Sequence, residues 1–252
     1  MIDIQKAGLW KRVAAWMLDV IMILILATGS GLALSNLMKY DQYVDRMNEA
    51  YERYEKEYGV DFDMTREEYE ALTPEKRAAY ESASKAVSED PQMIADYNMV
   101  VHQTLIMVSV GILFSVLILE FVVPILFGNG QTLGKKAFGI GLMRNDCVKV
   151  NRMQLFVRSL LGKYTIEIMF PIYVLLLSFL GVMGLTGTLV VAALFLVEAI
   201  LLIASKNHSQ IHDYLAGTVV VDITSQKIFE SAEARTEYTK RIHADMVSRK
   251  GY

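Results

Sequence analysis

The arrangement of apolar and polar residues predicts four membrane-spanning helices. Three stretches exceed the 20 or so mostly apolar residues that a helix needs to cross a bilayer: 13–37, 99–127 and 168–205. The third has 38 residues, and Gly181, Gly184 and Gly187 weaken its middle. We interpret it as two helices, roughly 166–180 and 188–205, joined by a tight connection. A single tilted and kinked helix is the alternative.

The head of the chain has some features of a secretory signal. Lys6, Lys11 and Arg12 precede the first apolar stretch. That stretch is too long for an ordinary signal core, and Asp19 lies where such a core is most hydrophobic. We therefore expect a first span that is not cleaved.

The uneven distribution of charge predicts the orientation in the membrane. The segment 128–163 carries seven basic residues against Asp146 alone, and the tail from Lys206 also carries seven. The segment 36–98 carries eight basic and sixteen acidic residues, a net charge of −8. Because positively charged loops tend to stay in the cytoplasm, we expect both termini inside and the acidic segment outside.

The acidic segment has the pattern of a helical insertion. Six residues recur at spacings of three and four: Tyr40, Tyr43, Met47, Tyr51, Tyr54 and Tyr58. This spacing predicts one face of a helix that continues the first span and ends at Gly59. Thr65 with Glu68 resembles a capping box, and Thr73–Pro74 and Asp90–Pro91 are typical helix starts. We expect the tyrosines to pack inward; a ligand-binding aromatic surface is the alternative.

Short strands are expected between and after the spans. The residues 139–143 and 147–150 flank a polar turn at Asn145–Asp146 and predict a β-hairpin, which a strand-like run ending at Val221 could join. A short helix around 154–163, carrying Arg158, is expected at the membrane interface. The predicted fold is an all-α membrane protein with four transmembrane helices, a helical extracytoplasmic insertion and a small cytoplasmic β-hairpin or strand element.

This organisation divides the chain into seven segments. They are the N-terminus with the first span (1–38), the insertion (39–98), the second span (99–127), the hairpin with the interfacial helix (128–165), the third and fourth spans (166–205), a cytoplasmic strand motif (206–224) and a tail (225–252).

Charged residues inside the spans are the main candidates for function. A carboxylate in hydrocarbon is costly unless it finds a partner or water. Asp19, Glu120 and Glu198 lie six or seven residues from the cytoplasmic ends of their spans, which is about 10 Å deep at the helical rise. The predicted charge layer consists of these acids with residues at the boundary: Arg12, Asp19, Glu120, Arg158, Glu198 and Asp213.

Two interpretations of this layer compete. In the structural one, the two arginines balance the acids, Asp213 anchors the loop after the last span to an arginine, and the pairs fix how the helices pack. In the functional one, the acids outnumber the available cations, so at least one takes up a proton or binds a monovalent cation.

Several spaced motifs flank the spans. They are Gly8 and Arg12 with Asp19; Thr132, Leu133, Gly134 and Lys135 with Gly139; Arg158; and His212 and Asp213 with Ala216, Gly217 and Thr218. In these motifs the chain resembles the RDD family of bacterial integral membrane proteins, named for an arginine and two aspartates. The residues 39–97 lie outside the shared pattern, and Cys147 stands where similar proteins often have glycine. The resemblance implies a bacterial cytoplasmic membrane and a transport-related role, with cation/proton antiport proposed for some members.

The sequence argues against an enzyme. The glycines around Ile140 lack the third glycine of a phosphate-binding pattern, and His212 and Asp213, being adjacent, would point apart in a strand with no activated nucleophile nearby. The single cysteine excludes a multi-cysteine metal site, and the four histidines are scattered along the chain. We therefore expect no metal and no cofactor.

The expected partners follow from the same features. The basic loop is expected to contact anionic lipid headgroups and not nucleic acid. A monovalent cation or a proton is the candidate substrate, and four spans form a thin bundle that suggests a homo-oligomer or a membrane partner protein. A scaffold or accessory subunit that transports nothing is the alternative function.

Overall fold

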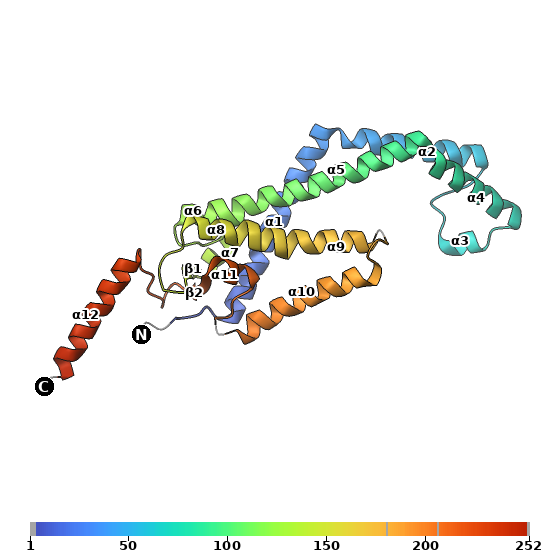
Figure 1. Cartoon of the computed structure of the whole chain (residues 1–252). Coiled ribbons are helices and arrows are strands. Elements are labelled where there is room, and N and C mark those ends of the chain that lie inside the picture. Colours follow the sequence, from blue (N-terminus) through green and yellow to red (C-terminus); the bar gives the residue numbers. More distant parts are fainter. Residues whose placement is uncertain (1–3, 180, 206, 251–252) are drawn as a thin grey trace. The chain divides into compact units, whose positions relative to one another are not determined.

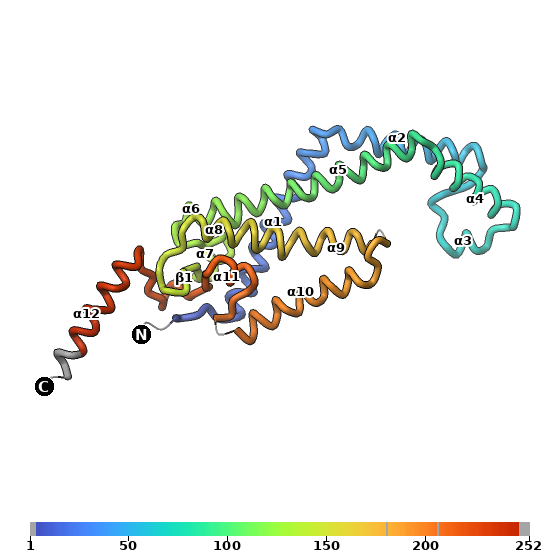
Figure 2. Tube along the Cα trace, viewed as in Figure 1, coloured from blue at the N-terminus to red at the C-terminus, as the bar shows by residue number. Residues whose placement is uncertain are grey.

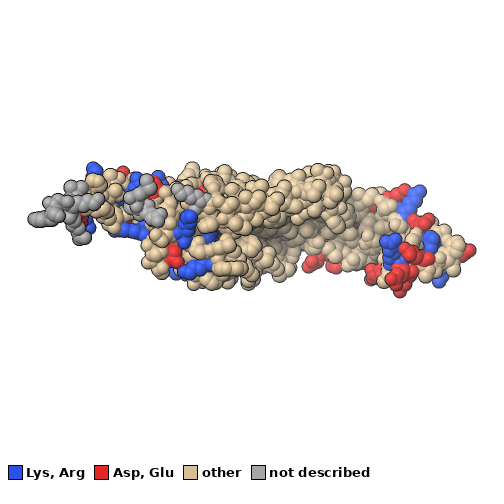
Figure 3. Space-filling view, turned by 90° about the horizontal axis from the view of Figure 1, so that it is seen from below, with Lys and Arg blue, Asp and Glu red and all other residues tan. Residues whose placement is uncertain are grey.

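The computed structural model describes residues 4–179, 181–205 and 207–250. Four helical runs are long and apolar enough to cross a membrane, as predicted: Leu9–Met38, Pro91–Phe127, Arg152–Phe179 and Gly184–Ala204. They expose large apolar side chains such as Leu24 and Phe195, and charged side chains are scarce over them on the face seen in Figure 3. Helices satisfy their own backbone polar groups, so this surface suits contact with hydrocarbon.

The chain forms two compact units. One consists of Met1–Ala27 and Ile112–Tyr252, and the other of Thr28–Gly111. The helices of the first unit and its borders are α1 (Leu9–Met38), α5 (Pro91–Val116), η1 (Leu117–Val122), α6 (Val123–Phe127), α7 (Leu133–Ala137), α8 (Arg152–Phe156), η2 (Val157–Met169), α9 (Phe170–Phe179), α10 (Gly184–Ala204), α11 (Ile211–Ala216) and α12 (Ala232–Lys250). Its strands are β1 (Ile140–Arg144) and β2 (Thr218–Asp222).

The third span begins earlier than predicted. α8, η2 and α9 form one continuous helical run from Arg152 to Phe179, so the helix expected around 154–163 is present as the start of the third span and not as a separate element. Arg158, Ser159 and Lys163 in its first half have hydrogen-bond partners inside the protein. The predicted tight connection is confirmed: α9 ends at Phe179 and α10 begins at Gly184, and the two helices lie side by side (Figure 1).

The small sheet is confirmed, but its strands pair differently from the prediction. The turn after β1 forms, with the Val148 carbonyl accepting from the Arg144 N–H at 2.8 Å. Beyond it the returning arm is joined to β1 by the isolated bridge between Met143 and Lys149, and its Val148 bridges to Phe229. The antiparallel partner of β1 is β2, with Leu142 opposite Val220.

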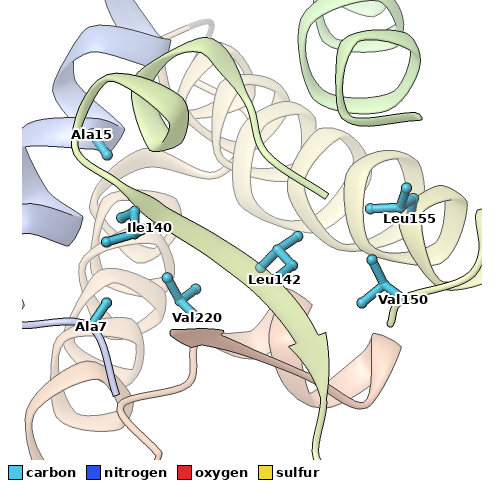
Figure 4. Close-up of a cluster of buried hydrophobic side chains, with 7 residues drawn as sticks. All are labelled: Ala7, Ala15, Ile140, Leu142, Val150, Leu155 and Val220. Atoms are coloured by element: carbon cyan, nitrogen blue, oxygen red, sulfur yellow. The ribbon is translucent and has the colours of Figure 1, made fainter. Parts of the chain in front are cut away.

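This pairing builds the main core of the first unit (Figure 4). The buried cluster around the two strands comprises Ala7, Ala15, Ile140, Leu142, Val150, Leu155 and Val220. The core therefore joins the head, the first span, the loop and the segment after the last span. Cys147, in the turn, has a φ of 63°, a left-handed conformation that favours glycine.

The second unit contains the helical insertion together with the end of α1 and most of α5. The helices of the insertion are α2 (Tyr40–Tyr58), α3 (Arg66–Glu70) and α4 (Pro74–Glu89), with α2 and α4 side by side (Figure 2). The predicted capping box at Thr65 is present, and Gly59 ends α2 in the left-handed conformation. The prediction that this helix continues the first span without a break is wrong, because Lys39 adopts the left-handed conformation, with a φ of 54°, and separates α2 from α1.

The tyrosine stripe is only partly inside the core of the insertion. The hydrophobic cluster at its centre comprises Ala50, Val87 and Met93, with Met47, Tyr54 and Phe62 packed against them. Tyr51 is exposed. The stripe therefore contributes to the core but also leaves aromatic surface open to solvent.

Candidate functional site

The first unit contains a cavity of about 390 Å³ that is lined by residues from all four spans. Its charged and titratable lining residues are Arg12, Asp19, Glu120, Lys135, Arg158, Lys163, Glu167, Glu198 and His212. Together with the fully buried Asp213, these residues are called the charged cluster below.

Asp19 binds the start of α7. Its Oδ1 accepts the Gly134 N–H at 2.8 Å, and its Oδ2 accepts the Thr132 hydroxyl. Thr132 in turn caps α7 by accepting the Lys135 N–H. Because the helix begins directly against α1, a Cβ on Gly134 would come within 2.1 Å of the Ala15 carbonyl oxygen. The threonine and glycine of this motif therefore dock α7 on the first span.

The lysine of the same motif connects two spans. Lys135 Nζ lies 3.9 Å from Asp19 Oδ2 and 4.0 Å from Glu120 Oε2. Glu120 also accepts from Lys163 Nζ of the third span. Burial, followed by the nearby charge of Lys163, lowers the pKa of Lys135 to about 8. Lys135 and Lys163 thus place two positive charges around one carboxylate.

Asp213 contacts both arginines of the charged cluster. Arg158 Nη1 donates to its Oδ1, and Arg12 Nη2 lies 3.6 Å from its Oδ2. The Thr218 hydroxyl donates to Oδ1 at 3.1 Å, and the Gln210 N–H donates to Oδ2 at 3.3 Å. The side chains of both arginines are at most 6% exposed. This carboxylate therefore joins α11 and β2 to the first and third spans.

Two glutamates face the N-terminus of α11. Glu167 Oε1 accepts the His212 N–H at 3.1 Å and lies 2.6 Å from His212 Nδ1. Glu198 Oε1 accepts the Ile211 N–H at 3.4 Å. The other oxygen of Glu198 is buried without a hydrogen-bond partner in the described structure, and the two glutamates interact electrostatically. This side of the cavity carries negative charge that the described residues do not balance.

The spans that carry Glu120 and Glu167 widen at these residues. Both lie in π-helical segments, η1 and η2. Pro124 and Pro171 each stand four residues beyond a glutamate and have no N–H to give to its carbonyl. Wide turns of this kind are frequent at functional sites.

The sequence identifies most residues of the charged cluster and one of its pairings. The prediction that Asp213 anchors the loop after the last span to an arginine is confirmed, because Asp213 contacts both Arg158 and Arg12. The arginines do not pair with Asp19, Glu120 and Glu198 as predicted; in the described structure, lysines lie beside Asp19 and Glu120. The segment after the last span supplies the strongest acceptor for the arginines, and α7 brings Lys135 to the acids.

Glu167 and Lys163 were not predicted as site residues. Glu167 lies at the start of the helix predicted over 166–180, but it directly precedes the apolar stretch 168–205 in which charged residues are sought, and Lys163 counts only as a charge of the loop. The signal that points to Glu167 is the repeated spacing of a glutamate four residues before a proline in two spans. No group of three or more His, Cys, Asp or Glu side chains in the described ranges is arranged to hold a metal ion.

The remaining motif residues shape the local backbone. Gly139 and Gly217 have φ values of 66° and 64°, and Gly217 ends α11 by donating its N–H to carbonyls of that helix. Thr218 begins β2 and also binds Asp213. These residues therefore place His212 and Asp213 at the cavity.

His212 makes the stability of the protein sensitive to acid. Burial, followed by the charge of Arg158, lowers its pKa well below 6.5. Although Nδ1 lies beside Glu167, the residue is 3% exposed, so we assign a neutral ring that donates its Nδ1–H. Below pH 6.5 the unfolded chain binds a proton that the folded protein does not, so stability falls by up to about 1.4 kcal/mol per pH unit.

Thermal unfolding in detergent between pH 7 and pH 5 measures this effect. We expect His212→Asn to have a flatter pH dependence than the parent, whatever its stability at pH 7. His243→Gln, which changes an exposed histidine of α12, should keep the parent slope. Equal slopes for the parent and His212→Asn would contradict the assignment.

The fold and the cavity define a helical membrane protein with four candidate spans whose charged residues meet in one cluster. The family model of the RDD family matches residues 6–217, more than four fifths of the chain. The chain therefore belongs to the RDD family. No curated protein and no solved structure matches it.

Proposed function

We propose that this RDD family protein is a membrane transporter that exchanges a monovalent cation or a proton at the charged cluster. The observation that carries the proposal is an excess of acid around the cavity. Its carboxylates are Asp19, Glu120, Glu167, Glu198 and Asp213, and its cations are Arg12, Lys135, Arg158 and Lys163. With His212 neutral, one carboxylate has no cation to balance it.

The excess is concentrated at Glu167 and Glu198. The arginines are engaged by Asp213, and the lysines lie closest to Asp19 and Glu120. Two neighbouring carboxylates in a cavity of low polarity favour the uptake of one proton or one monovalent cation, because both cannot stay charged without cost. Glu198, with one oxygen unpartnered, is the group we propose to exchange that charge.

We further propose the cellular setting of this activity. The basic loop and tail favour a bacterial cytoplasmic membrane with both termini in the cytoplasm. The cavity then opens near the inner leaflet, where anionic lipid surrounds the lysines and arginines of the loop. The proposal requires no resident metal ion, no cofactor and no catalytic step.

Flux in proteoliposomes tests the proposal. We expect a pH gradient to drive the uptake of sodium or potassium by the parent protein. Glu198→Gln and Glu167→Gln should each lower the rate at least tenfold, because each removes the exchangeable charge while keeping the shape of the side chain. Glu120→Gln and Asp19→Asn should also lower it. Glu230→Gln, an exposed change paired with Lys149, is the matched control and should keep the parent rate.

The same experiment addresses the alternative of a scaffold or accessory subunit. The observation in its favour is that most charges of the cluster already have partners in the protein, which suits a purely structural role. A folded parent with no flux of either cation would support it and contradict transport. Co-purification of stoichiometric foreign subunits from native membranes would support an accessory role, and a single species of defined mass would support a homo-oligomer.

A further inference from the structure

The helical insertion contains a second cavity, of about 820 Å³. It lies within residues 47–97 and is lined by α2, the loop before α3, α4 and the start of α5. Cavities of 300–1,000 Å³ commonly hold small molecules. This cavity belongs to the second unit and does not depend on the proposed transport function.

Aromatic rings form one wall of this cavity. Phe62 stands between Tyr51 and Tyr80, with ring centroids 5.5 Å from each and edge-on geometry. The loop that carries Phe62 is fixed by its N–H, which donates to Glu55 Oε1 at 2.8 Å. Tyr97, also in the lining, is 52% exposed. The rings therefore offer open faces and edges on a wall that the hydrogen bond holds in place.

The charge at this cavity is entirely negative. Glu52, Glu55 and Asp63 are in its lining, and no lysine or arginine is. Three basic residues of the insertion pair with acids other than Glu55 and Asp63: Arg46 with Asp96, Arg53 with Asp90, and Lys56 with Glu52 of the lining. Within this unit, all of whose residues are described, no ion pair reaches Glu55 or Asp63. Their charge therefore remains available to a ligand.

We propose that this cavity binds a small organic cation with an apolar body, such as an arylalkyl quaternary ammonium. Aromatic rings attract a cationic headgroup through their π faces, and the carboxylates of Glu55 and Asp63 add charge complementarity. A bare inorganic cation does not fit, because the aromatic and methionine side chains of the wall cannot replace its water. An anion would meet only negative charge.

Isothermal titration calorimetry on the full protein in lipid nanodiscs tests the proposal, with phenethyltrimethylammonium as the probe. Empty nanodiscs correct for partitioning into lipid, and 3-phenylpropanoate carries the same ring with the opposite charge. We expect saturable binding of one cation per chain and at least tenfold weaker binding of the anion.

Two variants separate the contributions of charge and ring. Glu55→Gln with Asp63→Asn removes two charges and keeps the oxygen that accepts the Phe62 N–H, so we expect at least fivefold weaker binding. Phe62→Leu should weaken binding by a similar factor. Glu57→Gln with Glu67→Gln removes two acids of the insertion that do not line the cavity. The affinity of this control for the cation should stay within twofold of that of the parent.

Three results would overturn the proposal. They are the absence of saturable binding beyond the empty nanodiscs, equal binding of cation and anion, and equal weakening by the control pair, which would indicate only the general acidity of the insertion. Circular dichroism of each variant checks that its helices are intact. If Phe62→Leu fails to fold, the comparison of Glu55→Gln with Asp63→Asn against the control pair still tests the proposal.

Discussion

Asp213→Asn is expected to lower the free energy of unfolding by about 3–5 kcal/mol, because it leaves buried charges without their partner. Asp213 is completely buried and contacts Arg158 and Arg12, which have little access to water. Asparagine keeps the shape but supplies no negative charge, so two guanidinium groups would remain close together and uncompensated. The same change removes one end of the link from α11 and β2 to the first and third spans.

Thermal unfolding of the purified protein in detergent measures this loss, which corresponds to a Tm lower by roughly 10 °C. Glu230→Gln is the matched control, because its ion pair with Lys149 has a glutamate side chain that is 81% exposed and should contribute little. In a double variant, Arg158→Met with Asp213→Leu, we expect a smaller loss than the sum of the single changes, since the partners are coupled. Additive losses would show that Asp213 does not hold the arginine.

Gly134→Ala is expected to be nearly as damaging, although it adds only one methyl group. The new Cβ would lie 2.1 Å from the carbonyl oxygen of Ala15 and 2.9 Å from the carboxylate carbon of Asp19. The first of these is backbone within the spanning helix α1 and cannot move aside. We expect α7 to be pushed away from α1, at a cost at or above the usual range of about 1–3 kcal/mol for overpacking.

Gly29→Ala provides the control for this prediction. Gly29 lies in the same helix, α1, with nothing within 4 Å of the position of a Cβ. Alanine favours a helix over glycine by up to about 1 kcal/mol, so the control should be as stable as the parent or slightly more stable. Thermal unfolding and the yield of folded protein distinguish the two variants. A Gly134→Ala protein with the parent Tm would show that α7 does not dock against α1 as described.

The sequence was sufficient to predict the number of candidate spans but not where the third begins, because length and hydrophobicity determine the apolar part of a span locally. The helix boundaries in the insertion were also predictable, since Gly59, Thr65 and Pro74 each act on the few residues around them. The spacing of Asp19, Glu120 and Glu198 from the span ends indicated a common depth, and all three line one cavity. Periodicity and end signals are properties of short segments.

Other pairings could not be predicted in the same way. The choice of β2 over the nearby arm at Lys149 as the partner of β1 depends on the burial of Ile140 and Val220 against distant parts of the chain. Similarly, the sequence indicates that Asp213 contacts an arginine, but the position of Lys135 beside Asp19 depends on where α7 docks. Both are decided by tertiary packing, to which residues more than fifty positions apart contribute.

The wide turns at Glu120 and Glu167 change how the second and third spans should be analysed. A π-turn holds about one residue more than an α-turn, so the residues beyond it are rotated by about 100° relative to a regular helix. A single helical wheel drawn over Pro91–Phe127 would therefore assign the wrong faces to one half of that span. Lipid-facing and protein-facing positions are best assigned separately on each side of η1 and η2, and scanning mutagenesis of these spans should be interpreted with the same shift in phase.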